Sequence, residues 1–168
     1  MGYAAVVGPD MSGNMTALPQ PTTDLRFGDV TLALHEIKPP PGDSGQGFVP
    51  YYHFRIILRE GSDAGYINFR VGDTRHITLC AGHIGFELRE EFRGWGYAFQ
   101  ACRALETFVR TIYSSVILTC NPTNVASRRT IERLGAEFLE EIDVPVDDPM
   151  YSKGTRKKLR YRWALEQA

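Results

Sequence analysis

The sequence predicts a single α/β domain, and three observations lead to that prediction. The 168 residues are enough for one well-packed core but too few for two. Two alternating apolar segments, 51–59 and 64–71, flank a polar turn at 60–63, as in a β-hairpin. Residues 98–112 repeat their apolar side chains with a period of about 3.6, which is typical of an amphipathic helix. We therefore expect a sheet flanked by helices.

The chain before residue 51 is expected to be irregular apart from one strand. Residues 1–22 are rich in Gly, Pro, Ser, Thr and Met and show no period, so we expect a flexible leader followed by the folded domain at 23–168. Weak alternation over 29–37 predicts the first strand. The segment 38–50 then contains four prolines and three glycines, a composition that disfavours regular structure.

The second half of the chain alternates between strands and helices. Over 76–88 we expect one long strand with a bulge near Gly82. The remaining expected elements are a short buried strand, a helix capped by Asn124 and ended by Gly135, and two final strands joined by a polar loop: 116–120, 124–135, 138–144 and 157–165, with the loop at 147–155.

Composition and charge argue against several kinds of protein. A net charge of −1 disfavours nucleic acid as an electrostatic partner, and no apolar run reaches the length of a membrane span. The three cysteines and the histidines lack the spacing of a zinc site or disulfide framework, so we expect no metal. Lys and Arg are absent before Arg26, so nothing at the N-terminus resembles a signal peptide. A cytoplasmic location is the simplest interpretation.

The segment Arg-Gly-Trp-Gly-Tyr-Ala at 93–98 lies between a strand pattern and a helix pattern. Its glycines let the backbone approach a ligand closely, and the N–H groups of a first helical turn point outward without helical partners. The helix dipole and Arg93 add positive charge at the same place. These properties predict a binding site for a phosphorylated ligand.

Two common phosphate-binding motifs do not fit this segment. A dinucleotide fingerprint requires a third glycine where Phe99 stands, and an acidic residue for the ribose that the segment after the helix lacks. No P-loop motif occurs in the chain. The pattern that does fit is Gln/Arg-x-x-Gly-x-Gly/Ala, which Arg93, Gly96 and Ala98 satisfy.

This pattern resembles the pyrophosphate loop of the GNAT superfamily of acetyl-CoA-dependent N-acetyltransferases. The preceding segment, Gly-His-Ile-Gly-Phe-Glu-Leu-Arg at 82–89, looks like the fourth strand of that superfamily. Residues 121–136 are similar to its signature Asn-x-x-Ala/Ser followed by Glu-x-x-Gly, in wording closer to the ribosomal-protein and small-molecule branches than to histone acetyltransferases. The resemblance implies a mixed, mostly antiparallel twisted sheet flanked by helices (α+β), with acetyl-CoA as cosubstrate.

The resemblance also implies where acetyl-CoA binds. In this superfamily the fourth and fifth strands separate, and the pantetheine arm lies between them. A backbone N–H there can stabilise the oxyanion of the transition state, a role worth about 3 kcal/mol. The expected cofactor-binding residues are Phe86, Leu88, Arg93, Gly94, Trp95, Gly96, Tyr97, Ala98, Asn124 and Ser127.

Three side chains are candidates for proton transfer. His83 stands where relatives often carry Glu, and an imidazole with a pKa of about 6.5 suits removal of the amine proton; the equal alternative is a hydrogen-bonded strand histidine. Glu87 lies nearer the point where the strands separate, although a solvated carboxylate is the simpler interpretation. The tyrosine that protonates the leaving thiolate in many relatives is replaced here by Ile131. We expect Ser127 as its substitute, with helix capping as the safer interpretation.

We expect an enzyme that transfers the acetyl group of acetyl-CoA directly to an amine, on a small molecule or on a protein or peptide. The superfamily's helices between the first two strands should be reduced or absent, because 38–50 is too rich in proline and glycine. The acceptor side should therefore be open, walled by a loop or completed by a second subunit in a homodimer. The alternatives are a non-catalytic acyl-CoA-binding or sensing module and, less favoured, a nucleotide-binding protein.

Overall fold

Strands form two antiparallel sheets in the part of the chain that the computed structural model describes, residues 18–21, 24–40 and 44–166. The strand order is β1-β2-β3-β4-β5 in one sheet and β6-β8-β7 in the other. The strands are β1 (Leu25–Phe27), β2 (Val30–Lys38), β3 (Tyr51–Leu58), β4 (Asp63–Arg70), β5 (Ile84–Leu88), β6 (Ser115–Cys120), β7 (Glu137–Asp143) and β8 (Lys157–Ala164). The helices are α1 (Tyr97–Val109), α2 (Val125–Arg133) and α3 (Pro149–Ser152), with short helical turns η1 (Ser44–Gln46), η2 (His76–Ala81) and η3 (Glu90–Phe92).

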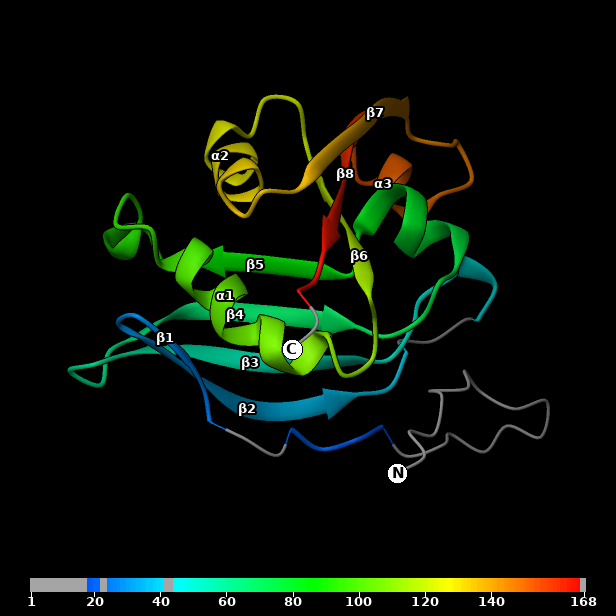
Figure 1. Ribbon diagram of the computed structural model, residues 1–168. Coiled ribbons are helices and arrows are strands. Elements are labelled where there is room, and N and C mark those ends of the chain that lie inside the picture. Colours follow the sequence, from blue (N-terminus) through cyan, green and yellow to red (C-terminus); the bar gives the residue numbers. More distant parts are fainter. Residues whose placement is uncertain (1–17, 22–23, 41–43, 167–168) are drawn as a thin grey trace.

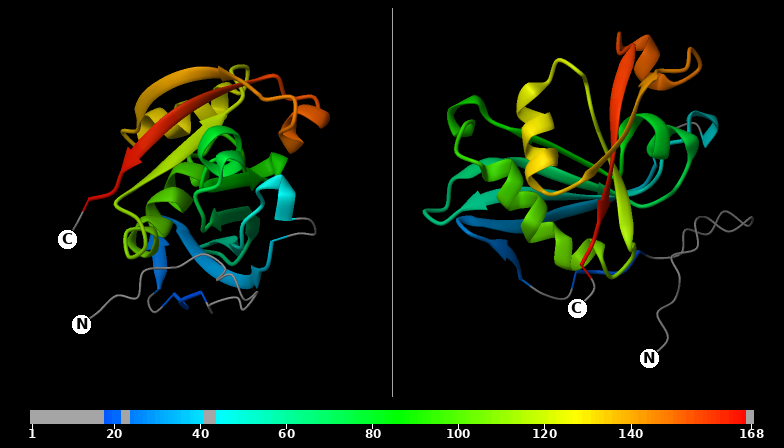
Figure 2. Two further views of the ribbon diagram at one scale, coloured as in Figure 1. Left: turned by 90° about the vertical axis from the view of Figure 1, so that its right-hand side faces the viewer. Right: turned by 45° about the horizontal axis from the view of Figure 1, so that its top comes forward.

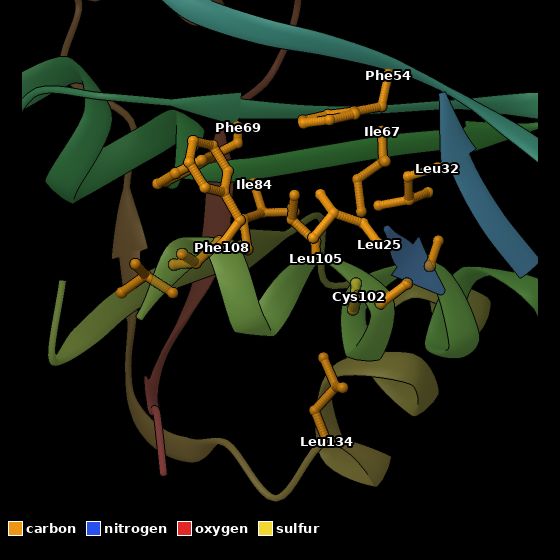
Figure 3. Close-up of a cluster of buried hydrophobic side chains, with 14 of the residues drawn as sticks. Leu25, Leu32, Phe54, Ile67, Phe69, Ile84, Cys102, Leu105, Phe108 and Leu134 are labelled. Carbon is orange, nitrogen blue, oxygen red and sulfur yellow. The ribbon is translucent and has the colours of Figure 1, made fainter. Parts of the chain in front are cut away.

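Helix α1 covers one face of the five-stranded sheet (Figure 1). Figure 3 shows the shared core, in which Leu105 and Phe108 of α1 lie next to Ile67 and Phe69 of β4. The rings of Phe69 and Phe108 meet edge to face with centroids 5.9 Å apart. Burying one large apolar side chain stabilises a fold by about 1.5–3 kcal/mol. This layer therefore fixes α1, and with it the glycine loop at the helix N-terminus.

The second sheet begins where the first ends. Figure 1 shows β6 passing close to the start of β5 and then running away from it, and Figures 1 and 2 show β8 between β6 and β7, with α2 packed beside this sheet. Val116 and Leu118 of β6 join Tyr161 and Trp163 of β8 in the same buried cluster as α1. One continuous core thus supports both sheets, although β5 and β6 form no ladder with each other within the described residues.

The face of the five-stranded sheet that points away from α1 is polar. Strand residues alternate between faces, so the residues between the buried positions of β3 and β4 share this second face with two residues of β5. We call this set the polar face: Tyr51, His53 and Arg55 of β3, Tyr66, Asn68 and Arg70 of β4, and Gly85 and Glu87 of β5.

The prediction of one long strand over 76–88 is wrong for the first half of that segment. Residues His76–Ala81 form the π-helical turn η2, and the strand begins only at Ile84. The Gly82 N–H donates to the Ile77 carbonyl, 2.8 Å away and five residues earlier, and φ is 74° at Gly82, where the turn ends. The buried positions His76, Ile77 and Cys80 have helical spacing, and that signal is present in the sequence.

The segment rich in proline and glycine contains little helix, as expected. In its described residues, 39–40 and 44–50, the helical structure is the single turn η1. Two contacts anchor the segment near η2: the Thr74 hydroxyl, two residues before this turn, donates to the Gly47 carbonyl at 2.6 Å, and the rings of Phe48 and His76 lie 5.2 Å apart. Residues 47 and 48 of this stretch therefore lie against η2 and Thr74.

The other predicted elements match the structure with shifts of a few residues at their ends. The sequence analysis missed β1, the four-residue helix α3 inside the expected polar loop, and the short turns η1 and η3. A strand of three residues is too short for its alternation to be recognised. Of the expected leader, Leu18 packs against the core and the Tyr52 hydroxyl donates to the Pro19 carbonyl. Residues 1–17, 22 and 23 lie outside the described residues, so the boundary between leader and domain stays a prediction.

Candidate active site

The loop 93–98 has the backbone geometry of an anion site. Gly94 and Gly96 have φ of 88° and 80°, in the left-handed region that other residues adopt only with strain. Helix α1 begins directly after Gly96, and the Gln100 N–H donates to the Gly96 carbonyl at 3.1 Å. The N–H groups of the first turn, 97–99, precede that bond and have no carbonyl within the helix to bind. They are therefore available to an anionic group.

A cavity of about 660 Å³ opens beside this loop. It is lined by the end of β5, the glycine loop, the start of α1 and one side of α2 together with its cap residue. Ten residues predicted from the sequence line it: Phe86, Glu87, Leu88, Arg93, Gly94, Gly96, Tyr97, Ala98, Asn124 and Ser127. The sequence did not predict five further lining residues: Phe99, Ala126, Arg129, Thr130 and Arg133. Trp95, which is 70% exposed, and His83 are not among the lining residues.

Three arginines give the cavity a positive charge. Arg93 Nε donates to the Leu88 carbonyl at 3.1 Å, and the Arg133 guanidinium lies over the Phe99 ring, 4.0 Å from its centroid. Arg129 is exposed at the rim. None of the three pairs with a carboxylate of the described residues, and Glu87 is the one acidic residue of the lining. These guanidinium groups suit the phosphates of a nucleotide-like ligand.

β5 and β6 are joined at one point and then separate. The His83 N–H donates to the Ile117 carbonyl at 2.8 Å, and the Ile117 N–H donates back to His83 Nδ1 at 2.9 Å. Beyond this point β5 pairs with β4 and β6 pairs with β8, so one edge of β5 from Ile84 onward lacks a neighbouring strand in the described structure. An extended ligand arm can bind along that edge as a strand would.

Both ring nitrogens of His83 are already occupied. Nδ1 accepts the Ile117 N–H, so Nε2 carries the proton and donates to Asp73 Oδ1 at 2.9 Å. The side chain is 3% exposed, and its ring lies 4.9 Å from that of Tyr113. This geometry favours the hydrogen-bonded alternative, in which His83 holds the two strands together. Its role as general base stays a prediction.

Glu87 lies at the boundary between the cavity and the polar face. Its carboxylate is exposed, and Oε2 accepts a hydrogen bond from the Tyr66 hydroxyl at 3.1 Å. Burial, followed by the bond to Glu87, raises the pKa of Tyr66, so this hydroxyl remains protonated and keeps donating. Tyr66 stands directly opposite Glu87 where β4 pairs with β5. The sequence analysis did not predict how these two strands align, so it did not predict this contact.

The two candidates on α2 are held in its first turn. The Asn124 side chain caps the helix by accepting the Ser127 N–H at 3.1 Å, as predicted for a capping residue. Ser127 is half-buried and lines the cavity. Its proposed role as proton donor to the thiolate stays a prediction.

The fold and the site together define a transferase that uses an acyl-CoA. The central strands separate beside a positively charged helix N-terminus, and the cavity continues from there to an exposed carboxylate. Residues 33–137 match the family model of the acetyltransferase (GNAT) domain, so the chain belongs to the GNAT acetyltransferase family. As a member of this family, it is an enzyme whose cosubstrate is acetyl-CoA.

Solved structures share this fold at low sequence identity. RimL, a ribosomal L7/L12 α-N-protein acetyltransferase in its apo form, is 20% identical with a TM-score of 0.54, over 70% of this chain and 72% of its own. A GNAT acetyltransferase from Bacillus anthracis is 23% identical with a TM-score of 0.53, over 68% and 67%. The microcin C7 self-immunity acetyltransferase MccE, in complex with acetyl-CoA and AMP, is 16% identical with a TM-score of 0.50, over 68% and 61%. No curated protein sequence matches the chain.

Membrane spans and metal clusters are both absent from the described residues. None of their helices is long and apolar enough to cross a membrane. The same residues contain no group of three or more His, Cys, Asp and Glu side chains that could hold a metal ion.

Proposed function

We propose that this acetyltransferase moves the acetyl group of acetyl-CoA directly to a primary amine while both substrates are bound. The observation that supports this most strongly is the cavity, which extends from the glycine loop along β5 to Glu87. The pyrophosphate would bind the N–H groups at the start of α1, and the pantetheine arm would lie along the open edge of β5. The thioester would then lie near Glu87. RimL is an α-N-protein acetyltransferase, so its acceptor is a protein amine, and this supports an amine here.

The chemistry requires a neutral amine and a stabilised oxyanion. The amine nitrogen attacks the thioester carbon, the carbon–sulfur bond breaks, and the products are an amide and free CoA. We assign removal of the amine proton to Glu87, directly or through one water, because its carboxylate is exposed and oriented by Tyr66. A backbone N–H of β5 would stabilise the oxyanion. Ser127 remains our candidate for returning a proton to the thiolate.

The test measures release of free CoA thiol from acetyl-CoA with a panel of primary amines. Thiol release that depends on an amine, with a matching acetylated product by mass spectrometry, is the expected result. Stabilisation of the protein by acetyl-CoA without turnover of any amine would instead identify a sensing module on the same fold. A cytoplasmic location and a homodimer stay predictions, and gel filtration with light scattering checks the second.

A further inference from the structure

Arg70 lies at an unusual position on the polar face. Its guanidinium is packed directly against Gly85, since a Cβ built there would lie 2.8 Å from Nη2 and 3.2 Å from Nη1. Only glycine leaves room for this arrangement. Gly85 is the neighbour of Glu87 on the same face of β5, two residues earlier. The guanidinium is therefore placed beside the point where β5 and β6 separate, on the side opposite α1.

The hydrogen bonds of Arg70 leave one edge of its guanidinium available. Nη1 donates to the carbonyls of Ala81 and Gly82, at 3.3 Å and 3.0 Å, which fixes the group in place. Nε and Nη2 make no hydrogen bond with the described residues, and neither nitrogen is fully buried. Two parallel donors on one edge of a guanidinium match the two oxygens of a carboxylate.

Lys158 of β8 supplies a second cation. Two residues further along β8, Arg160 Nε donates to the Thr78 carbonyl of η2, the turn whose end binds Arg70. The Lys158 side chain is half-buried, and its ammonium forms neither a hydrogen bond nor an ion pair within the described structure. Burial lowers the pKa of Lys158, and the positive charge of Arg70 lowers it further. Burial also lowers the pKa of Arg70. The Asp148 carboxylate raises the pKa of Lys158, but it is already bonded to the buried His76 ring at 2.9 Å.

Two poorly hydrated cations without a paired carboxylate are an unstable arrangement that a bound anion would relieve. The region also offers an opposite charge at a suitable separation. Glu87 is two strand residues from Gly85, or about 7 Å along β5. A ligand with an ammonium or amino group a few bonds from a carboxylate could reach both.

We propose that the amine acceptor carries a carboxylate, as a free amino acid does, and that Arg70 and Lys158 bind this carboxylate while the amino group is held beside Glu87. This inference rests on the proposed transfer to an amine and adds the class of acceptor. Arg70 and Lys158 are acceptor-binding residues in this scheme, on the opposite side of β5 from the acetyl-CoA cavity.

The experiment compares matched acceptors in the full-length protein. Each amino acid of a panel is assayed against its own carboxamide, with ethanolamine and phosphoethanolamine as a second pair and short peptides as a third group. Charge-assisted hydrogen bonds predict that the best amino acid exceeds its carboxamide in kcat/KM by about 10–100-fold. Equal rates for acid and amide, or a preference for peptides, would overturn the inference while leaving acetyl transfer intact. A preference for phosphoethanolamine over every carboxylated amine would overturn the assignment of a carboxylate as the anionic group of the acceptor.

Two neighbouring lysines provide a variant and its control. Lys158→Gln should reduce the preference for acid over amide about tenfold, because it removes one of the two cations proposed to bind the carboxylate. Lys157→Gln removes the same charge from the adjacent exposed residue, whose ammonium pairs with Asp143 at 2.7 Å, and should leave the preference unchanged. An equal loss of kcat/KM for acid and amide in Lys158→Gln would assign that lysine to folding and overturn its role in binding the carboxylate.

A binding measurement keeps the inference testable without turnover. Calorimetry of the CoA-saturated protein should show binding of the preferred amino acid and weaker binding of its carboxamide. Arg70→Lys, which keeps the charge but loses the two-donor edge, should weaken the acid selectively. Binding of acids without any thiol release would contradict the proposed transfer but support the carboxylate site. Absence of binding by every carboxylated amine would overturn the site.

Discussion

The two sides of β5 are built in different ways. On the cofactor side, the cavity is formed by short continuous segments: the glycine loop with the start of α1, and the Asn124 cap with the start of α2. On the acceptor side, Arg70 packs against Gly85 of the neighbouring strand, and Lys158 comes from a strand of the other sheet, so only the fold brings these residues to one region. Local backbone rules therefore determine the first side, and tertiary packing determines the second. The contrast predicts that changes on each side will affect one substrate and leave the other unaffected.

Gly96→Asp should give the largest effect and abolish acetyl-CoA binding. The new carboxylate would repel the phosphates, and an Asp at φ 80° is strained by about 1–2 kcal/mol. Calorimetry with acetyl-CoA measures the loss. Gly61→Asp is the matched control, because φ is 95° there and a Cβ would meet nothing within 4 Å. A folded Gly96→Asp protein with unchanged affinity would remove the loop from the cofactor site.

Glu87→Gln should lower kcat by about 10²-fold or more, since it removes the proposed proton acceptor but keeps the Tyr66 hydrogen bond. The KM for acetyl-CoA should stay the same. The decline of the rate toward low pH, where a base becomes protonated, should disappear in this variant. Glu90→Gln in η3 is the control for charge. Nearly full activity in Glu87→Gln at neutral pH would direct the search back to His83 or to a bound water.

His83→Ala should affect stability more than the proton-transfer step. It leaves the Ile117 N–H without its acceptor in a buried site, which costs about 1–3 kcal/mol in the free energy of unfolding by denaturant titration. Asp73→Asn, which keeps an acceptor for Nε2, should cost less. Loss of turnover by about a hundredfold in a fully folded His83→Ala protein, with loss of an acidic limb near the imidazole pKa, would instead support His83 as the base.

Arg133→Gln should weaken acetyl-CoA binding about tenfold through the loss of one charge–phosphate contact. Dephospho-acetyl-CoA, which lacks the 3′-phosphate, separates the phosphates: if Arg133 contacts that group, the variant should bind both cofactors alike. Arg128→Gln, on the same helix but outside the cavity lining, is the control. An undiminished preference for the 3′-phosphorylated cofactor would assign Arg133 to the pyrophosphate or to its Phe99 contact alone.

Thr74→Val should give the smallest effect, a rise of a few-fold in acceptor KM with unchanged acetyl-CoA affinity. It removes the hydrogen bond that ties Gly47 of the proline- and glycine-rich segment to the residues before η2. Thr74→Ser keeps the hydroxyl and should behave as the parent protein. Parallel loss of both substrates in Thr74→Val would mean that the segment supports the fold as a whole.

The sequence predicted the two sides of β5 to different extents, for the same physical reason. Gly94, Gly96 and Asn124 were predicted from rules that involve only neighbouring residues, and the structure shows the expected backbone and cap. Arg129 and Arg133 were missed although they lie on the helix that Asn124 caps, because helical periodicity alone does not show which face meets the loop. Arg70 and Lys158 had no local signal. The strand predicted over residues 76–81 is wrong because it disregards the helical spacing of their apolar side chains.

The π-helical register of η2 makes this chain sensitive to the deletion of a residue from the turn. In an α-helical register the Gly82 N–H would bind the Thr78 carbonyl; in the π register it binds Ile77, and the Thr78 carbonyl accepts Arg160 Nε and Nη2 of β8 instead, at 3.0 Å and 2.8 Å. The end of the same turn presents the Ala81 and Gly82 carbonyls to Arg70. Deleting one residue from 76–81 would tighten the turn and withdraw these acceptors from two arginines at once. Acceptor preference in this enzyme should therefore be more sensitive to a single-residue deletion here than to most side-chain substitutions in the same turn.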